Sequence, residues 1–240
     1  MNNLASRRLP GPATRDVPEP SGGFLLALAL LAAAGWVDGL GYVQWHGLFV
    51  SFMSGNTTAF GAATVAHDGA AAIEAGRAVL IFVVGVVVGE LLRAATGRWT
   101  RSIVLGAETL LLGLAYAAAT RHWGEAATAT ITGLAMGVQT AAVHKAAGLT
   151  VSLTYVTGTL VNIGRSVVKA LLGEAPWRDA LSYLGLWCAL FVGSAGGAIV
   201  AALSTPMALL VAASLLAGLS AVAISTAWMQ PATPSGNSAD

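Results

Sequence analysis

The stretch FVSFMSGNTTAFG, residues 49–61, concentrates hydrogen-bonding side chains in a chain that is otherwise rich in Ala, Leu, Val and Gly. Its polar residues are Ser51, Ser54, Asn56, Thr57 and Thr58. A surface loop is the simplest explanation, but apolar and aromatic residues flank the stretch, and it contains neither a proline nor a charge. The rest of the sequence therefore has to explain why polar groups gather here.

The composition is that of an integral membrane protein. Of the 240 residues, 56% are hydrophobic and only 10% are charged, against roughly 25% charged in an ordinary soluble domain. The net charge of +1 comes without the clustered Lys and Arg of a nucleic-acid-binding protein. The His residues are scattered, and no phosphate-binding loop or nucleophile elbow is present, so we expect no metal, no cofactor and no enzymatic activity. The lipid bilayer is the expected partner.

Hydrophobic run length predicts which segments cross the bilayer. A helix needs about 20 apolar residues to cross a hydrocarbon core of about 30 Å. Runs of this kind cover residues 24–44, 75–92, 103–119, 126–143, 181–203 and 207–228. Two further runs, 48–66 and 150–170, are rich in Ser, Thr and Gly, and either cross or are shorter segments.

Charge placement separates these two alternatives. If all eight runs crossed from a cytoplasmic N-terminus, Arg93, Arg98 and Arg101 would lie outside, against the tendency of basic residues to remain in the cytoplasm. If the two polar runs enter and leave on one side, only Arg77 and Arg121 of the 12 basic residues lie outside. The sequence therefore predicts an all-α protein with six transmembrane helices and two re-entrant or broken helical segments. Both termini are then cytoplasmic, with residues 1–22 and 230–240 as disordered tails.

The polar stretch has a counterpart in the second half of the chain. SFMSGNTTAFG, residues 51–61, aligns with TYVTGTLVNIG, residues 154–164, so that a hydroxyl–Gly pair and a later Gly coincide. GWVDGLG at residue 35 and GVQTAAV at residue 137 precede the two copies, and a Gly-x-x-x-Gly pattern follows each. We interpret residues 23–120 and 121–229 as two membrane repeats. Three crossings per repeat make the repeats inverted, which is the plan of many secondary transporters.

These motifs resemble a known family. GWVDGLGYVQWHGLFVSFMSGNTTAFG is similar to the hallmark of the YoaK-like family of small bacterial inner-membrane proteins of unknown function, and GVQTA and TYVTGTLVNIG extend the resemblance over about residues 24–228. The motif positions implied by the resemblance are Asp38, Ser54, Gly55, Asn56, Thr57, Gln139, Thr157 and Gly158. Thr140 departs from the pattern, where an Asn is expected. The resemblance implies about six spans in a bacterial inner membrane, but no activity.

Three acidic residues fall inside predicted spans: Asp38 and Glu108 lie well within them, whereas Glu90 lies near the end of the run 75–92 and is expected to pair with Arg93. Insertion of a carboxylate into the bilayer centre costs on the order of 2.5–3.5 kcal/mol, so each is a candidate functional or structural residue. Asp38 either relays a proton or cation, or hydrogen-bonds the polar segment and holds it in place. Glu108 lies within the run 103–119 and is a second candidate for ion coupling.

The candidate solute-binding residues lie in or near the two polar stretches: Asp38, Ser54, Gly55, Asn56, Thr57, Gln139, Thr157, Gly158 and Asn162. Gly55 and Asn56 form the sharpest pair, because a small residue beside an amide suits an unwound segment that contacts a solute. The alternative is that Ser54, Thr57 and their neighbours only cap a break in a helix. Gln139 and Asn162 are the second-half counterparts.

The leading interpretation is a small secondary permease for a polar or organic-anion solute, with its site between two inverted repeats. A non-transporting membrane scaffold or accessory subunit is the alternative, because Gly-rich faces also serve helix packing. The sequence leaves open the solute, the coupling ion and a homo-oligomeric state.

Overall fold

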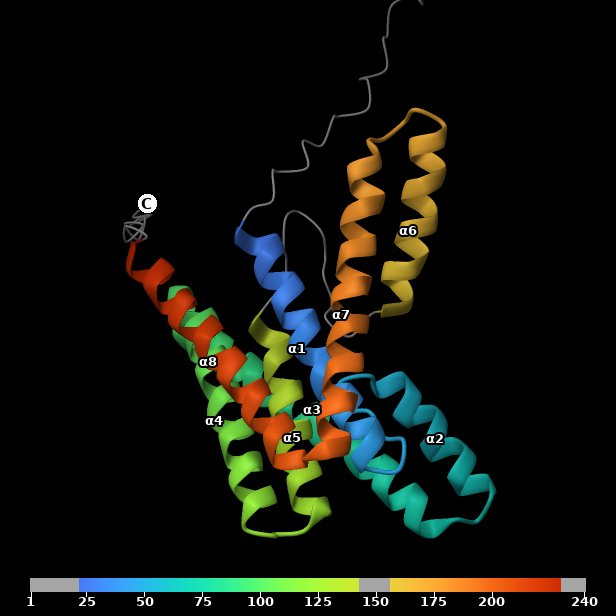
Figure 1. Cartoon of the computed structure of the whole chain (residues 1–240), viewed down its shortest axis with the longest axis vertical. Helices are drawn as coiled ribbons and strands as arrows, with labels where there is room; N and C mark the ends of the chain where they lie inside the picture. The colour runs from blue at the N-terminus through green and yellow to red at the C-terminus, as the bar shows by residue number, and fades with distance from the viewer. Residues whose placement is uncertain (1–21, 143–155, 230–240) are drawn as a thin grey trace, which may run out of the picture.

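The computed structural model describes residues 22–142 and 156–229, and in these ranges the chain is helical with no strand (Figure 1). The helices are α1 (Gly22–Gln44), α2 (Met53–Val65), α3 (Gly69–Thr96), α4 (Thr100–Thr120), α5 (Glu125–Gln139), α6 (Val156–Leu171), α7 (Trp177–Leu203) and α8 (Thr205–Met229). Short 3-10 turns, Gly97–Trp99 and Thr140–Ala142, follow α3 and α5. The predicted all-α class is confirmed.

Five helices are long and apolar enough to cross a membrane, namely α1, α3, α4, α7 and α8. The other three have 13, 15 and 16 residues, which is short of a full crossing. The predicted span 126–143 coincides with α5 and its 3-10 turn, and its last residue lies outside the described residues. The two predicted tails, apart from Gly22, and the start of the second polar run also lie outside them.

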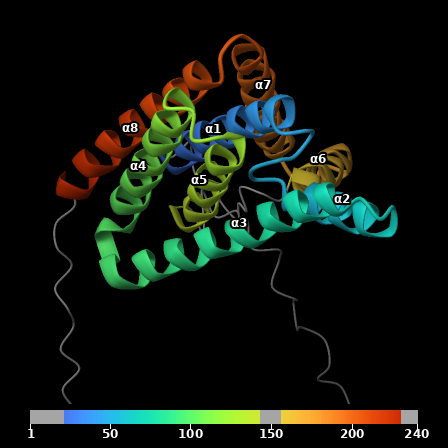
Figure 2. The same ribbon diagram turned by 90° about the horizontal axis from the view of Figure 1, so that it is seen from below.

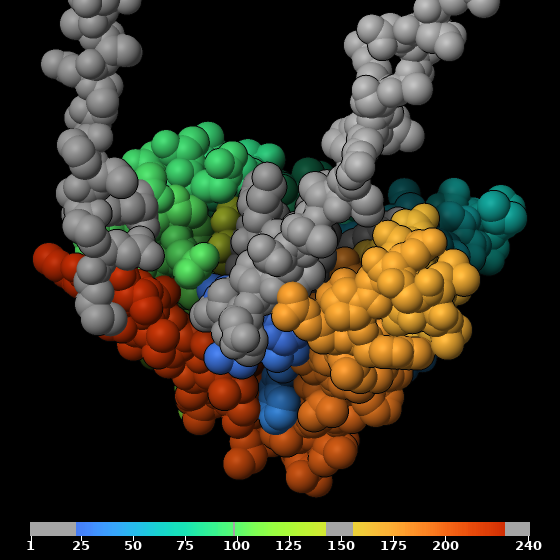
Figure 3. Space-filling model, turned by 90° about the horizontal axis from the view of Figure 1, so that it is seen from above, coloured from blue at the N-terminus to red at the C-terminus, as the bar shows by residue number. Residues whose placement is uncertain are grey.

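The long helices of the first half of the chain pack mainly against helices of the second half. α1 packs on α7, α3 packs on α5, and α4 packs on α8. Of the three short helices, α2 and α6 lie at the periphery, α2 against α3 and α6 against α7 (Figure 2), whereas α5 packs against both α3 and α4. Seen from the other side, a strip of α1 is visible between α7 and α8 (Figure 3). Each half is thus completed by helices of the other.

Glycines bring α1 and α7 into close contact. A Cβ atom on Gly193 or Gly197 of α7 would overlap the carbonyl oxygens of Ala32 and Trp36, and one on Gly39 of α1 would overlap a carbonyl oxygen of α7. The missing side chains let the two backbones approach directly, as is typical of small-residue helix interfaces in membranes.

The crossing of α3 and α5 is built in the same way. A Cβ atom on Gly85 would overlap the carbonyl oxygen of Leu134, and one on Gly89 would come within 2.8 Å of that of Val138. From the other helix, Gly137 faces the carbonyl oxygen of Phe82. Both Gly-x-x-x-Gly patterns noted in the sequence therefore lie at helix crossings.

The outer surface is apolar, whereas the interior holds many small residues. Exposed side chains include Leu80 and Val87 of α3, Leu110 of α4, and Val192 and Ile199 of α7. Alanines and leucines such as Ala27, Leu30, Ala208 and Ala212 are fully buried. An outer surface of this kind is suited to lipid rather than water.

Candidate functional site

The segment between α1 and α2 turns back toward the middle of the molecule. His46 and Gly47 adopt positive φ angles of 51° and 79°, and the Leu48 N–H closes the turn by donating to the Trp45 carbonyl at 3.0 Å. The following residues, 48–52, lead to the start of α2 at Met53. This returning segment carries the first part of the FVSFMSGN motif.

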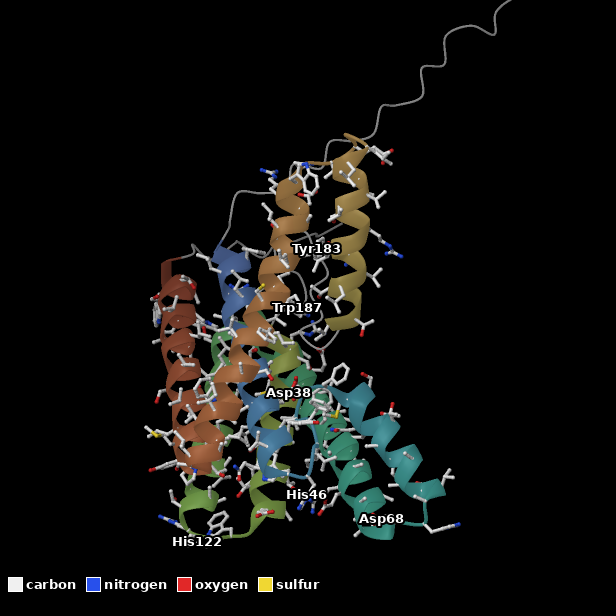
Figure 4. All side chains as sticks on the ribbon, turned by 45° about the vertical axis from the view of Figure 1, so that its right-hand side comes forward. Asp38, His46, Asp68, His122, Tyr183 and Trp187 are labelled. Atoms are coloured by element: carbon white, nitrogen blue, oxygen red, sulfur yellow. The ribbon has the colours of Figure 1, made fainter. Side chains whose placement is uncertain are left out.

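Asp38 holds this segment from the side of α1. Its Oδ1 accepts hydrogen bonds from the backbone N–H groups of Val50 and Ser51, both at 2.7 Å, and its Oδ2 accepts one from the Ser51 hydroxyl at 2.6 Å. The side chain lies at mid-height in the bundle, with His46, Asp68 and His122 toward one end (Figure 4). Because Asp38 is buried, these three donors replace the water that a carboxylate needs.

Asn56 holds the same segment from the side of α2. Its carbonyl oxygen accepts from the Phe49 N–H at 2.9 Å, and its amide nitrogen donates to the Phe49 carbonyl at 2.7 Å. The amide thus pairs with both backbone groups of Phe49, as a neighbouring β-strand would. The Asn56 side chain is 1% exposed, so water does not compete for these bonds. The structure thereby brings both Asp38 and Asn56 into hydrogen bonds with residues 49–51.

Gly55 makes room for aromatic side chains. A Cβ atom at this position would lie 2.9 Å from ring carbons of both Phe49 and Phe52, closer than side chains tolerate. The two rings meet edge to face with centroids 5.2 Å apart. Gly55 thus serves packing, and only Gly fits without moving a ring.

The hydroxyl groups on α2 bond to their own helix. Thr57 donates to the Met53 carbonyl at 2.8 Å, and Thr58 donates to the Ser54 carbonyl at 3.0 Å. Ser54, Thr57 and Thr58 are exposed on the outside of the molecule. Bonding to a carbonyl one turn earlier lets a hydroxyl face an apolar environment.

A pocket of about 190 Å³ joins the two halves at this place. From the first half it is lined by Gly35, Asp38, Phe49, Ser51 and Phe52, and from the second half by Val156, Leu190 and Ser194. Val156 is the first residue of α6 and Phe52 immediately precedes α2, so the starts of α2 and α6 border one cavity. From there α2 and α6 run toward opposite ends of the molecule (Figure 1).

Of the predicted site residues, only Asp38 lines this pocket in the described part of the chain. Thr157 and Gly158 follow Val156 in the first turn of α6, and Asn162 lies about one turn further on. Gln139 and Glu108 are buried on α5 and α4, and neither lines this pocket among the residues that the structure describes.

Sequence reasoning missed seven of the eight pocket residues, all except Asp38. Ser51 stands in the quoted motif and binds Asp38, so its hydroxyl in an apolar run was a usable signal. Leu190 and Ser194 belong to α7 and carry no pattern that distinguishes them from other residues of a span.

The apolar helices and the buried polar segment define an all-α membrane protein. The chain belongs to the family described as Protein of unknown function (DUF1275), whose family model matches residues 26–222. It is 31% identical over 209 residues to UPF0700 transmembrane protein RA0705 of Rhizobium meliloti (strain 1021), covering 86% of this chain and 89% of that protein. No solved structure matches. The predicted membership of a membrane family of unknown function is confirmed.

Proposed function

We propose that the protein is a secondary permease for a small polar or organic-anion solute, which binds where the starts of α2 and α6 meet. The observation that carries this proposal is the cavity of about 190 Å³ lined by residues of both halves. It is smaller than the roughly 300–1,000 Å³ of pockets for drug-sized ligands, which favours a small solute. A bacterial inner membrane is the proposed location, in keeping with a bacterial transmembrane relative.

Two inverted repeats are part of the proposal, and the packing between the two halves supports them. If the repeats are superposed, α1 of the first repeat corresponds to α5 of the second. In the same way, α3 corresponds to α7, and α4 corresponds to α8. The crossing of α1 with α7 then corresponds to that of α5 with α3, and both depend on glycines at aligned positions. The pairs α2–α3 and α6–α7 correspond as well. A two-fold relation explains all of these pairs together.

In this proposal, α2 and α6 are the broken segments of the two repeats. Each starts beside the shared pocket, and the two extend to opposite ends of the molecule (Figure 1). Helix N-termini carry partial positive charge, which favours an anionic group in the pocket. The rings of Phe49 and Phe52 then receive the apolar part of the solute.

The predicted site residues take different parts in this mechanism. We assign the positioning of the pocket wall to Asp38, Gly55 and Asn56, because they hold residues 49–52. Thr157, Gly158 and Asn162 follow the pocket residue Val156 on α6 and do not line the pocket themselves. No chemical step is required of any of them.

One observation favours a membrane scaffold as the second candidate. The hydrogen bonds of Asp38 and Asn56 are made within the chain, which a purely structural role explains without a solute. The scaffold predicts that the pocket can be filled without consequence, whereas the permease requires it to be open.

Filling the pocket separates these two candidates. Val156→Trp is expected to reduce uptake at least tenfold, because the indole occupies the space between the starts of α2 and α6. Uptake would be measured in proteoliposomes with radiolabelled benzoate, lactate, succinate and glycerol. Val168→Trp is the matched control, since Val168 lies on the same helix and is 54% exposed. Absence of uptake of every solute by the wild type, or equal uptake by both variants, contradicts the permease.

Reporter fusions test the orientation. We propose six spans, with α5 and the residues that follow it forming one of them, and both termini in the cytoplasm. A fusion after Arg98 is then expected to read as cytoplasmic, and one after Asp68 as periplasmic, in a paired alkaline phosphatase and green fluorescent protein assay. A periplasmic signal after Arg98 would overturn the six-span arrangement.

A further inference from the structure

Glu108 is a buried carboxyl group in the middle of α4, away from the proposed solute pocket. Its side chain is fully buried, and neither carboxylate oxygen has a hydrogen-bond partner in the described part of the chain. It belongs to a buried stripe that includes Leu105, Leu112 and Ala115. This placement differs from that of Asp38, whose oxygens accept three hydrogen bonds.

The helices around Glu108 supply no cation for it. α4 packs against α3, α5 and α8. α8 contains no ionisable side chain, and α5 contains only Glu125, its first residue. On α3, Arg93 is paired with Glu90 at 2.6 Å, and Glu74 and Arg77 lie in its N-terminal part. On α4 itself, Arg101 is in the first turn and exposed. An ionised carboxylate without a partner is very costly in such a place, and a neutral carboxylic acid is much less so.

Buried polar side chains form a column on the helices that enclose Glu108. On α5, Thr128, Thr132 and Gln139 are spaced four and seven residues apart, which places them on one face. With a rise of about 1.5 Å per residue from the turn between α4 and α5, Glu108 lies at a level between Thr132 and Gln139. The amide nitrogen of Gln139 also lacks a partner among the described residues.

The column continues on α4 and α8, toward the N-terminal end of α4. The Ser220 hydroxyl of α8 donates to the Ser102 carbonyl of α4 at 3.4 Å, and the Ser102 hydroxyl is buried with no partner among the described residues. A Cβ atom on Gly106 would lie 3.8 Å from the Ser220 hydroxyl, so this group is close to the turn of α4 that precedes Glu108.

A pocket opens at each end of the column. One, of about 300 Å³, is lined by Thr128 together with Gln44, His122 and Thr205. The other, of about 360 Å³, is lined by Ser102 together with Arg101, Ala142 and Thr226. They lie at opposite ends of α4, so Glu108 stands between two openings that each contain a member of the polar column.

We propose that Glu108 binds a proton, which it exchanges with water in these two pockets through the column of Thr, Ser and Gln side chains. A hydronium ion in one pocket supplies a proton to a carboxylate oxygen and becomes water, and the neutral carboxyl group then releases a proton to a water molecule in the other pocket, which regenerates the carboxylate. The coupling of this proton to solute movement rests on the proposed permease function, whereas the binding of the proton does not.

Infrared spectroscopy of the full-length protein in liposomes tests proton binding directly. The wild type is expected to show a deuterium-sensitive C=O stretching band of a protonated carboxyl group in an apolar environment, which decreases as the pH is raised. Glu108→Gln removes this band, and Glu90→Gln, a matched change on an acid that is already paired, leaves it. A wild-type spectrum without the band at any pH, or a band that persists in Glu108→Gln, overturns the proposal.

Transport assays test the coupling separately. With a benzoate, lactate, succinate or glycerol uptake established, Glu108→Gln is expected to lose the accumulation driven by a pH gradient, at least tenfold, while exchange of labelled for unlabelled solute continues. Equal pH-driven accumulation in Glu108→Gln and wild type contradicts the coupling. If the wild type moves none of these solutes, the permease proposal fails, and the infrared result alone decides whether Glu108 binds a proton.

Discussion

Gly197→Ala is expected to destabilise the folded protein by about 1–3 kcal/mol, although it adds a single methyl group. The added Cβ would overlap the carbonyl oxygen of Trp36, and a backbone atom of a packed helix cannot turn away as a side chain can. The two helices would have to separate. That movement also endangers the hydrogen bond from the Trp36 indole to the Ala208 carbonyl, 2.9 Å long, which ties α1 to α8. Thermal unfolding in detergent, followed by Trp fluorescence, measures the effect.

Gly218→Ala is the matched control on α8. A Cβ atom there meets nothing within 4 Å, and Ala is favoured over Gly in a helix interior by up to about 1 kcal/mol. The control is therefore expected to melt at the same temperature as the wild type or higher. If the two variants melted together, close contact at Gly197 would not be what holds α1 to α7. Gly85→Ala, at the equivalent crossing of α3 and α5, should behave like Gly197→Ala.

Hydrophobic run length located the long helices better than the short ones. The predicted runs 24–44, 103–119, 181–203 and 207–228 fall within α1, α4, α7 and α8, because uninterrupted apolar sequence has few alternatives in a bilayer. The run 75–92 underestimated α3, which starts at Gly69 after the capping Asp68. In the run 48–66 the sequence indicated a break, but the position of the turn depends on bonds from Asp38 and Asn56 that no local pattern encodes.

Of the predicted site residues, Asp38 alone lines the pocket among the residues that the structure describes. The sequence left open whether Asp38 relays an ion or holds the polar segment, and the three hydrogen bonds to Val50 and Ser51 support the holding role. Nothing in the sequence ranked Glu108 above Asp38 for ion binding. The difference between them lies in long-range surroundings, since one carboxylate meets donors from a returning segment and the other meets none in the described residues.

Asp38→Ala is expected to release residues 48–52 and to destabilise the protein by several kcal/mol. It leaves two backbone N–H groups and the Ser51 hydroxyl buried without an acceptor, at about 1–3 kcal/mol for each unsatisfied group. Asp38→Asn is expected to be much milder. The amide oxygen can still accept from the Val50 and Ser51 N–H groups, and the amide nitrogen can donate to the Ser51 hydroxyl, which reverses its own role from donor to acceptor.

The comparison of these two variants decides whether the charge of Asp38 or its hydrogen-bond geometry matters. Melting temperature and the reactivity of a cysteine placed at Leu48 report on the returning segment, and solute uptake reports on function. Asp68→Ala provides the scale for an exposed acid, because it removes only the cap to the Ala71 N–H, at about 0.5–2 kcal/mol. If Asp38→Asn kept its stability and yet abolished uptake, the negative charge itself would be required, and Asp38 would share the ion-binding role that we assign to Glu108. Retention of both properties in Asp38→Asn, with loss of both in Asp38→Ala, is the outcome that the hydrogen bonds predict.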